Sequence, residues 1–194
     1  RVLVDEVARL DEMARSFSQF GRMPDGPAAP VDLVELLEGL TAPFGRTVTL
    51  HVPPGGAPHV HGHVDALGRV LRNLVVNALE AAEVHSGPDG ARVHVALAAD
   101  DEAVVVTVDD NGPGVPPELR DDIWSPDVTT KRRGTGLGLA LVRQTVLHHG
   151  GTVHVGEAPG GGARFTVRLP LGGAAAEAED PTGRSGASTP TETA

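Results

Sequence analysis

Apolar residues recur along the chain with two periods, which predict an alternation of helices and strands between residues 31 and 171. Apolar positions spaced three and four residues apart share one face of an α-helix, whereas apolar residues that alternate with polar ones are typical of a half-buried strand. Several alternating stretches are rich in Val and Thr, which favour strands. The mixture predicts an α/β (α+β) fold built as a two-layer sandwich. Helices are expected at 31–42, 64–84 and 137–149, a short turn near 117–123, and strands at 47–52, 92–98, 103–109, 151–155 and 163–169.

Residues 1–22 show the apolar pattern of an amphipathic helix. Its apolar positions lie four and three residues apart, which is the seam of a heptad repeat and needs a partner helix. One interpretation is a helix packed on its own domain. The other is the second half of a helical hairpin whose first helix lies before Arg1. The seam consists of Leu3, Val7, Leu10, Ala14 and Phe17.

Two segments without apolar periodicity flank the predicted domain at 31–171. Residues 23–30 are rich in Pro and Gly and are expected to form a linker. Residues 172–194 contain no Val, Leu, Ile or aromatic residue, so this tail cannot bury enough apolar surface to order itself and is expected to be disordered. The first residue is Arg rather than Met, so we expect the chain to be a fragment of a longer protein.

Composition excludes several classes of function. The net charge of −10 disfavours a nucleic-acid binder, whose surface would be basic. The absence of Cys excludes disulfide scaffolds, Cys-zinc sites and thiol chemistry. No apolar run approaches the roughly 20 residues that span a bilayer. With 40% apolar residues among 194, the chain can bury an aliphatic core, so the candidate chemistry lies in its polar motifs and glycines.

The first motif lies in the predicted helix at 64–84. Asn73, Asn77 and Glu80 are four and three residues apart, so they share one helical face beside an apolar stripe. Asn is a poor helix former, and each amide needs hydrogen-bond partners. The face is either a solvated polar surface or a site where neutral amide oxygens hold a hard cation such as Mg²⁺.

The second motif follows the Val-rich strand at 103–109. The sequence DDNGPG places the carboxylates of Asp109 and Asp110 at the end of the strand, and Gly112 and Gly114 come directly after them. One interpretation is an ordinary Asp-Asn-Gly turn. The other is a carboxylate that accepts a hydrogen bond from an exocyclic amine, with glycines that let a ligand approach the backbone.

The third motif precedes the predicted helix at 137–149. The stretch KRRGTGLG, residues 131–138, begins with three cations and continues with alternating glycines. Successive backbone N–H groups at a helix N-terminus bind anions, although a flexible loop would have a similar composition. It is not a P-loop, because no Gly-Lys-Ser/Thr follows. It is not the dinucleotide fingerprint either, because the spacing is G-x-G-x-G and no strand precedes it.

The His residues offer weaker candidates. His59, His61 and His63 alternate, but a helix start interrupts a strand there, and no acid or Cys completes a ligand set. We therefore expect a surface strand end rather than a metal site. His148 and His149 end a predicted helix before two glycines, where His suits the helix dipole.

Taken in this order, the three motifs resemble the ATP-binding fold of gyrase B, MutL, chaperone ATPases and histidine kinases. They most resemble the catalytic and ATP-binding domain of bacterial sensor histidine kinases. RNLVVNALEAA resembles the N box, DDNGPGV the first glycine box, IWSPDVTTKRRGTGLGLALV the F box and second glycine box, and HHGGTVHVGEAPGGGARFTVRLP the closing hairpin. The resemblance implies a Bergerat-type fold, with a mixed sheet covered on one face by helices. It also implies that residues 1–22 are the second helix of a dimerisation and phosphotransfer hairpin, so the parent protein is expected to be a homodimer.

The resemblance further implies a site for Mg-ATP. Asn77 would be the Mg²⁺ ligand, and Asn73 would contact phosphate or metal-bound water. Asp110 would accept a hydrogen bond from the adenine amino group. The segment from about 113 to 136 would form a lid over the nucleotide, in which Lys131 neutralises phosphate charge and shares the catalytic role with Asn73. The other nucleotide contacts implied are Gly112, Gly114, Arg133, Gly134, Thr135, Gly136, Leu137 and Gly138.

The implied reaction transfers the γ-phosphate of ATP to a His of the hairpin, for relay to an Asp of a response regulator. Asn73 stands where ATPases of the superfamily place a Glu that activates water, and an amide cannot be that base. None of the nine His residues lies in the family's phosphoacceptor motif, so the chain is expected to bind Mg-ATP without phosphorylating itself. The alternatives are an anti-sigma-type Ser/Thr kinase and an ATP-binding pseudokinase or sensor module. We expect a cytoplasmic chain with no nucleic-acid partner, and the membrane anchoring of its parent stays open.

Two positions depart from the family's pattern. The F box usually carries Phe residues, whereas this chain has IWSPDV at 123–128, in which Trp124 can replace an aromatic anchor. His63 stands where the family often has an Asp at the start of a helix, and this change removes a cap worth about 1 kcal/mol.

Overall fold

The computed structural model describes residues 27–126, 128 and 136–171. The predicted helix at 1–22, most of the predicted linker and the predicted tail at 172–194 lie outside these ranges. Helices and strands alternate along the described chain, as the apolar periods predict. The helices are α2 (Leu33–Thr41), α3 (Val64–Ser86) and α4 (Gly138–His148), with short 3-10 turns η1 (Ala42–Phe44), η2 (Pro117–Leu119) and η3 (Asp122–Trp124). The strands are β1 (Ala29–Val31), β2 (Val48–His51), β3 (Val60–Gly62), β4 (Val93–Ala99), β5 (Ala103–Asp110), β6 (Thr152–Glu157) and β7 (Ala163–Pro170).

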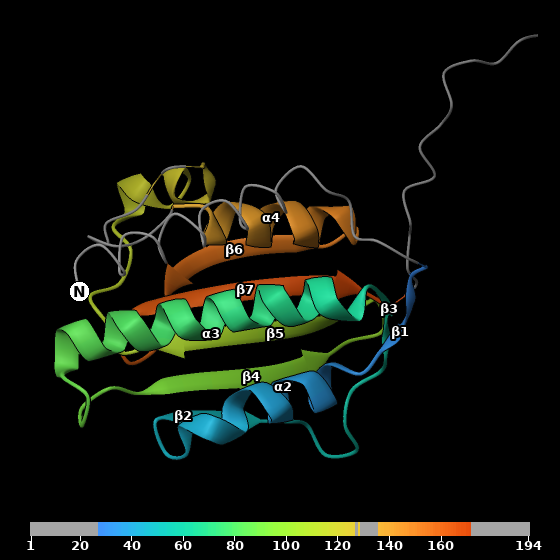
Figure 1. Cartoon of the computed structure of the whole chain (residues 1–194), viewed down its shortest axis with the longest axis horizontal. Coiled ribbons are helices and arrows are strands. Elements are labelled where there is room, and N and C mark those ends of the chain that lie inside the picture. The colour runs from blue at the N-terminus through green and yellow to red at the C-terminus, as the bar shows by residue number, and fades with distance from the viewer. Residues whose placement is uncertain (1–26, 127, 129–135, 172–194) are drawn as a thin grey trace, which may run out of the picture.

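Five strands form one mixed sheet in the order β2-β4-β5-β7-β6. The β2–β4 pair is parallel, and the other three pairs are antiparallel. Helices α2, α3 and α4 all lie on the same face of this sheet (Figure 1), and α3 and α4 pack against each other as well as on the strands. The predicted two-layer α/β sandwich is confirmed.

Alternation along the strands explains why only one face carries helices. In β5, Val104, Val106 and Val108 are buried, whereas the residues between them are half-buried on the other face. In β7, Phe165, Val167 and Leu169 repeat the pattern against their β5 partners. The side chains that these strands turn away from the helices are mostly Thr, Asp and Arg, so this face can remain in water.

Helix α3 lies across the middle of the sheet (Figure 1) and holds the first motif at the edge of its buried stripe. Leu67, Leu71, Leu74 and Ala78 are buried at helical spacing. The N-cap of the helix is His63, whose side chain makes no capping bond, as the sequence predicts. In α2, by contrast, Asp32 caps the first turn by accepting bonds from the N–H groups of residues 34 and 35, at 2.8 and 3.2 Å.

A second, two-stranded sheet is absent from the sequence prediction. Strand β1 pairs antiparallel with β3, and Ala29 lies opposite Gly62. The last residues of the predicted linker at 23–30 therefore belong to the folded domain, which begins before residue 31. Three-residue strands are too short to show a period, and the Pro in β1 is typical of a linker or of an edge strand.

Candidate functional site

Asp110, at the end of β5, is a buried carboxylate with only 4% of its surface exposed. Its Oδ1 accepts a hydrogen bond from the N–H of Gly112 at 2.8 Å and another from the N–H of Ala163 at 3.2 Å. Among the described residues, none donates to Oδ2. One oxygen therefore fixes the side chain, and the other can accept a hydrogen bond from a ligand.

Burial raises the pKa of Asp110 above its ordinary value. The two backbone N–H groups act in the opposite direction, and the neighbouring charge of Asp109 raises the pKa further. No cation contributes to this balance among the residues that the structure describes. A ligand that donates a hydrogen bond, such as an amine, would satisfy the desolvated oxygen of this carboxylate. An apolar ligand would leave that oxygen without a partner.

Glycines enclose Asp110 closely from two directions. A Cβ added to Gly112 would lie 2.8 Å from Asp110 Oδ1 and 3.0 Å from Ala81 of α3. Gly162, in the turn between β6 and β7, has φ +83°, and a Cβ there would lie 2.0 Å from the carbonyl oxygen of Asp110. A Cβ on Gly114 would in turn lie 3.2 Å from the Gly162 carbonyl oxygen. Both turns must lack side chains for the backbone to approach this closely.

Gly162 and Ala163 do not appear among the site residues that the sequence predicts. Their only sequence signal is the run of three glycines at 160–162, which reads as a hairpin turn. They reach Asp110 because β7 pairs with β5 in a register that places Arg164 opposite Asp109. That register is a property of the sheet, and a run of glycines does not indicate it.

The first and third motifs contact each other, and the helix of the first motif also contacts the turn after β5. Asn73 and Asn77 are half-buried on α3, and Ala81, one further turn along, packs against Gly112. The Asn73 side-chain amide donates to the carbonyl oxygen of Gly138 at 3.4 Å. The helix face predicted from the spacing of the Asn residues thus connects the turn after β5 to the start of α4.

The N-terminus of α4 is the part of the third motif that the structure describes. The helix begins at Gly138, and its N-cap, Leu137, is buried and makes no side-chain capping bond. The unpaired N–H groups of a first turn carry partial positive charge, which favours phosphate. Gly136 also lies within the described residues, whereas Lys131, Arg133, Gly134 and Thr135 lie outside them.

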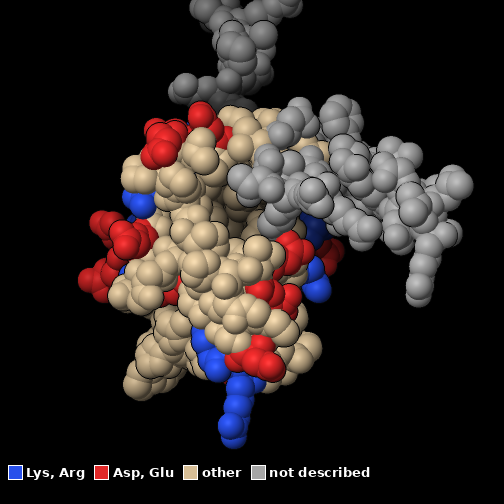
Figure 2. Space-filling model, turned by 90° about the vertical axis from the view of Figure 1, so that its left-hand side faces the viewer, with Lys and Arg blue, Asp and Glu red and all other residues tan. Residues whose placement is uncertain are grey.

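The segment that leads from β5 toward α4 is anchored by an aromatic contact. Trp124 of η3 is buried and packs edge-on against Phe165 of β7, with ring centroids 6.0 Å apart. Trp124 therefore ties this segment to β7 through a buried aromatic contact. Figure 2 shows that acidic and basic side chains are interspersed on the described surface at the end of the molecule where β5 terminates.

The His residues make structural contacts. His61 is exposed on the short strand β3, as predicted for a strand end, and His59 lies 3.6 Å from Asp32. His149 is buried rather than simply exposed at the end of a helix. Within the part of the chain that the structure describes, no three His, Cys, Asp or Glu side chains form a cluster that could hold a metal ion.

None of the described helices is both long enough and apolar enough to span a bilayer.

A profile of the family described as histidine kinase-, DNA gyrase B- and HSP90-like ATPase matches residues 62–173. Over 134 residues the chain is 38% identical to the sensor histidine kinase CpxA of Escherichia coli strain K12, in an alignment that covers 66% of this chain and 28% of CpxA. The chain thus spans less than a third of that relative.

Solved structures agree with these sequence relatives. The catalytic domain of the histidine kinase ThkA, in a nucleotide-free form, superposes with a TM-score of 0.65 at 27% identity, and the match covers 75% of this chain and 97% of that domain. Full-length ShkA in complex with AMPPNP superposes with a TM-score of 0.69 at 29% identity, over 89% of this chain and 37% of ShkA.

Proposed function

This chain belongs to the histidine kinase-, DNA gyrase B- and HSP90-like ATPase family, as an ATP-binding catalytic domain of the sensor histidine kinase type, and from this we propose how its residues act. The domain binds Mg-ATP and transfers the γ-phosphate to a His of a phosphoacceptor hairpin. The observation that carries the proposal is the buried Asp110 carboxylate. Its Oδ1 is held by two backbone N–H groups between two glycine turns, and its Oδ2 is left for a ligand.

Asp110 recognises the adenine base in this proposal. Its Oδ2 accepts a hydrogen bond from the exocyclic amino group, and Gly112 and Gly114 let the flat base approach the backbone. Because the carboxylate is buried, a base that cannot donate at this position leaves a desolvated acceptor unsatisfied, which costs about 1–3 kcal/mol.

Asn77 holds the magnesium ion through its amide oxygen, and Asn73 contacts a phosphate or metal-bound water. Half-buried amides on one helix face fit a hard cation that keeps part of its water shell. The bound ion supplies charge neutralisation and orientation for phosphoryl transfer. Lys131 and Arg133 add positive charge. The N–H groups around Gly134, Thr135, Gly136, Leu137 and Gly138 wrap the phosphates.

Transfer to histidine, rather than hydrolysis, follows from the chemistry of residue 73. A hydrolytic enzyme needs a base to activate water, and the amide of Asn73 does not titrate. In the transfer, the bond between the γ-phosphorus and the bridging oxygen of ADP breaks, and a bond to an imidazole nitrogen forms. The phosphate then passes to an Asp of a response regulator. The parent protein acts as a homodimer in the cytoplasm, where ATP and the regulator are available.

Calorimetry of Mg-ATP binding tests the proposed site. Asp110→Asn and Asn77→Ala should each weaken binding by at least tenfold, because each removes one charge-assisted or metal contact. Val76→Ala, next to Asn77 on the exposed side of α3, is the matched control and should bind like the wild type. A folded wild-type chain that does not bind Mg-ATP would contradict the proposal.

A further inference from the structure

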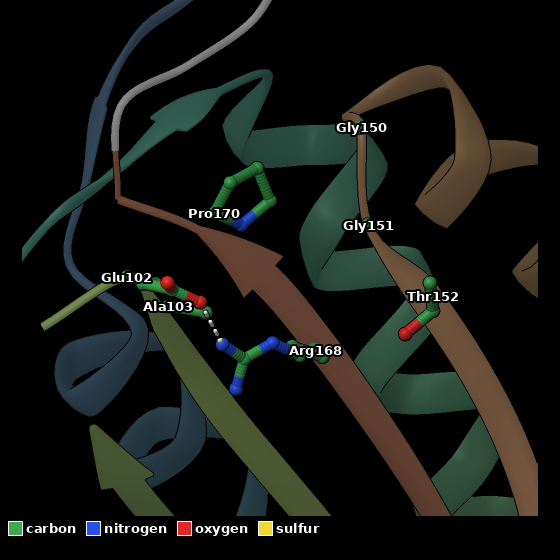
Figure 3. A pocket seen from close by; sticks show the side chains of 7 residues that line it. All are labelled: Glu102, Ala103, Gly150, Gly151, Thr152, Arg168 and Pro170. Atoms are coloured by element: carbon green, nitrogen blue, oxygen red, sulfur yellow. Dashed lines mark hydrogen bonds and ion pairs between the residues drawn. The ribbon is translucent and has the colours of Figure 1, made fainter. Parts of the chain in front are cut away.

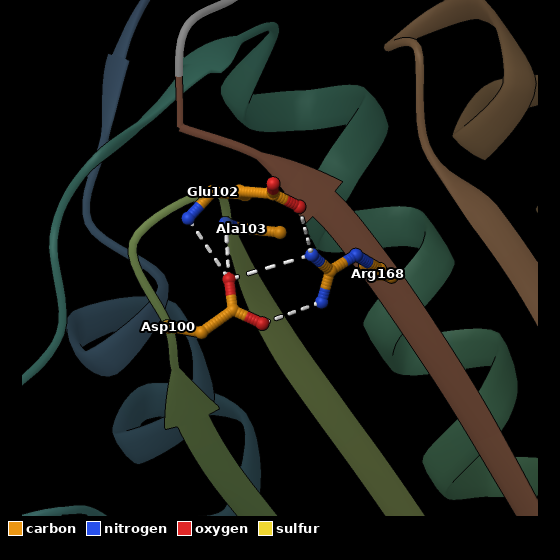
Figure 4. A network of polar contacts seen from close by, with 4 residues as sticks. All are labelled: Asp100, Glu102, Ala103 and Arg168. Carbon is orange, nitrogen blue, oxygen red and sulfur yellow. Dashed lines mark hydrogen bonds and ion pairs between the residues drawn. The ribbon is translucent and has the colours of Figure 1, made fainter.

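Strand β7 carries two arginines on the open face of the sheet, and each pairs with acidic residues at one end of β5. Arg164 pairs with Asp109, next to the carboxylate of Asp110. Arg168 pairs with Asp100 and Glu102 at the opposite end (Figure 4). The two pairs are chemically alike and differ in their distance from the candidate adenine site.

The Arg164–Asp109 pair is bidentate and partly buried. Arg164 Nε donates to Asp109 Oδ1 at 2.6 Å, and Nη2 donates to Oδ2 at 2.5 Å. The Asp109 side chain is only 13% exposed, and that of Arg164 is 38% exposed. The bond to Asp109 also raises the pKa of Arg164. Two parallel bonds of this kind restrict both the separation and the rotation of the groups that they join.

This pair is the last rung of the β5–β7 ladder. Asp109 lies opposite Arg164 in the register, and the ladder ends there. The next residue of β5 is Asp110, and the preceding residue of β7 is Ala163, whose N–H donates to Asp110 Oδ1 at 3.2 Å. Before Ala163 come Gly160, Gly161 and Gly162, which have no side chains. Arg164 is therefore the first residue after this turn whose side chain ties the turn to β5.

We infer that Arg164 is a positioning residue, which holds the β7 backbone against β5 so that Ala163 fixes the carboxylate of Asp110 toward the adenine amino group. The inference rests on the proposed function. It states that the Arg164–Asp109 pair sets the preference for a base that carries an amino group, without touching the nucleotide.

Arg168 provides a matched control within the same strand. Its Nη1 lies 2.7 Å from Asp100 Oδ2, and its Nη2 lies 3.2 Å from Glu102 Oε2. These acidic side chains are 53% and 86% exposed, so the pair is more solvated than the Arg164 pair. Arg168 also lines a pocket of about 160 Å³ with Thr152 and Pro170 (Figure 3).

The test measures the affinity of the full chain for two Mg-nucleotides, ATP and purine riboside triphosphate, whose base lacks the amino group. We expect Arg164→Met to weaken ATP binding about tenfold and to change binding of the purine analogue less than twofold, because only ATP uses the Asp110 oxygen. Arg168→Met should keep the wild-type ratio of the two affinities. Arg164→Lys keeps the positive charge but cannot form the two parallel hydrogen bonds, so it should give an intermediate ratio of the two affinities.

Several outcomes would overturn the inference. If Arg164→Met keeps the wild-type ratio of the two affinities, whether or not both affinities fall, the Arg164–Asp109 pair only stabilises the sheet. If Arg164→Met does not fold, an unchanged ratio in Arg164→Lys would overturn it instead. A wild-type chain that binds the two nucleotides equally would contradict the proposed role of Asp110, and the inference about Arg164 would fail with it. That failure is visible before any variant is compared.

Discussion

At the scale of single residues, the fold buries the Asp110 carboxylate in its charged form, which is unfavourable until a ligand donates a hydrogen bond to it. Burial raises its folded pKa above the ordinary value of 3.8, so the unfolded chain ionises this group more readily. At neutral pH the buried charge therefore costs stability. The cost is removed as the pH falls through the folded pKa toward 3.8, because the folded state then binds the proton first.

The first prediction concerns the charge of Asp110. Asp110→Asn keeps an oxygen for the two N–H groups and removes the buried charge. We expect the Tm of the ligand-free protein at pH 7 to rise by a few degrees while Mg-ATP binding weakens at least tenfold, as measured by thermal unfolding with and without nucleotide. A lower Tm at pH 7 would show that the ionised carboxylate stabilises the fold.

The second prediction compares two glycines of one turn. Gly162 has φ +83° and a Cβ there would meet the Asp110 carbonyl, whereas a Cβ on Gly160 would meet nothing within 4 Å. Gly162→Ala should lower the free energy of unfolding by about 1–3 kcal/mol and weaken ATP binding. Gly160→Ala should change stability by less than about 0.5 kcal/mol. Equal urea-unfolding curves for the two variants would contradict this.

At the scale of elements, a buried histidine joins the end of α4 to the start of α3. His149 Nδ1 donates to the carbonyl oxygen of Thr145 at 2.7 Å, and its Nε2 accepts the backbone N–H of His63 at 3.1 Å. A Cβ on Gly62 would lie 2.5 Å from the His149 ring, so glycine makes room for it. His149 thus satisfies a backbone N–H at the start of a helix whose own N-cap side chain makes no capping bond.

The third prediction concerns the pH dependence of this contact. Burial, above all, lowers the pKa of His149 below its ordinary 6.5, and the neighbouring His63 and His148 lower it further. Below pH 6.5 the unfolded chain therefore binds a proton that the folded chain excludes, and stability falls as the solution is acidified. When the pH is lowered from 7.5 to about 5.5, the Tm of His149→Leu should fall less than the Tm of the wild type. Parallel Tm profiles would exclude this role.

At the scale of the whole molecule, the sheet brings together groups from four parts of the chain. The end of β5 contacts the β6–β7 turn and, through Gly112, the C-terminal half of α3, and Asn73 of α3 bonds the start of α4. Each element is held by the aliphatic core between helices and sheet, so the site rests on rigid supports. The phosphoacceptor, in our proposal, comes from another domain.

The fourth prediction tests whether the phosphoacceptor His must be supplied by another domain. Incubated with radiolabelled Mg-ATP, the chain should not label itself but should label a supplied phosphoacceptor hairpin on histidine, and Asn77→Ala should abolish transfer. The label should be lost in acid and kept in base, as expected for phosphohistidine. Acid-stable label would indicate a Ser/Thr kinase. ATP binding without any transfer would indicate a sensor module.

The periodic elements could be predicted from the sequence because each carries its own signal. The stripe of Leu67, Leu71 and Leu74 indicates α3, and alternating Val residues indicate β5, since burial on one face requires these periods. The motifs around Asn77 and Asp110 could also be found, because their order resembles a known family. Strands β1 and β3 could not, because each is three residues long and is stabilised only by its distant partner.

The sequence by itself determined the longer helices and strands of the described domain, which face of each is buried and which polar side chains lie at their ends, because these depend on local spacing. The tertiary structure decided what surrounds Asp110. Ala163 and Gly162 follow it by more than fifty residues, and only the β5–β7 register brings them within contact. In the same way, His149 reaches His63 only because α4 packs beside α3. Contacts between distant segments depend on how the whole core packs, which no local pattern specifies.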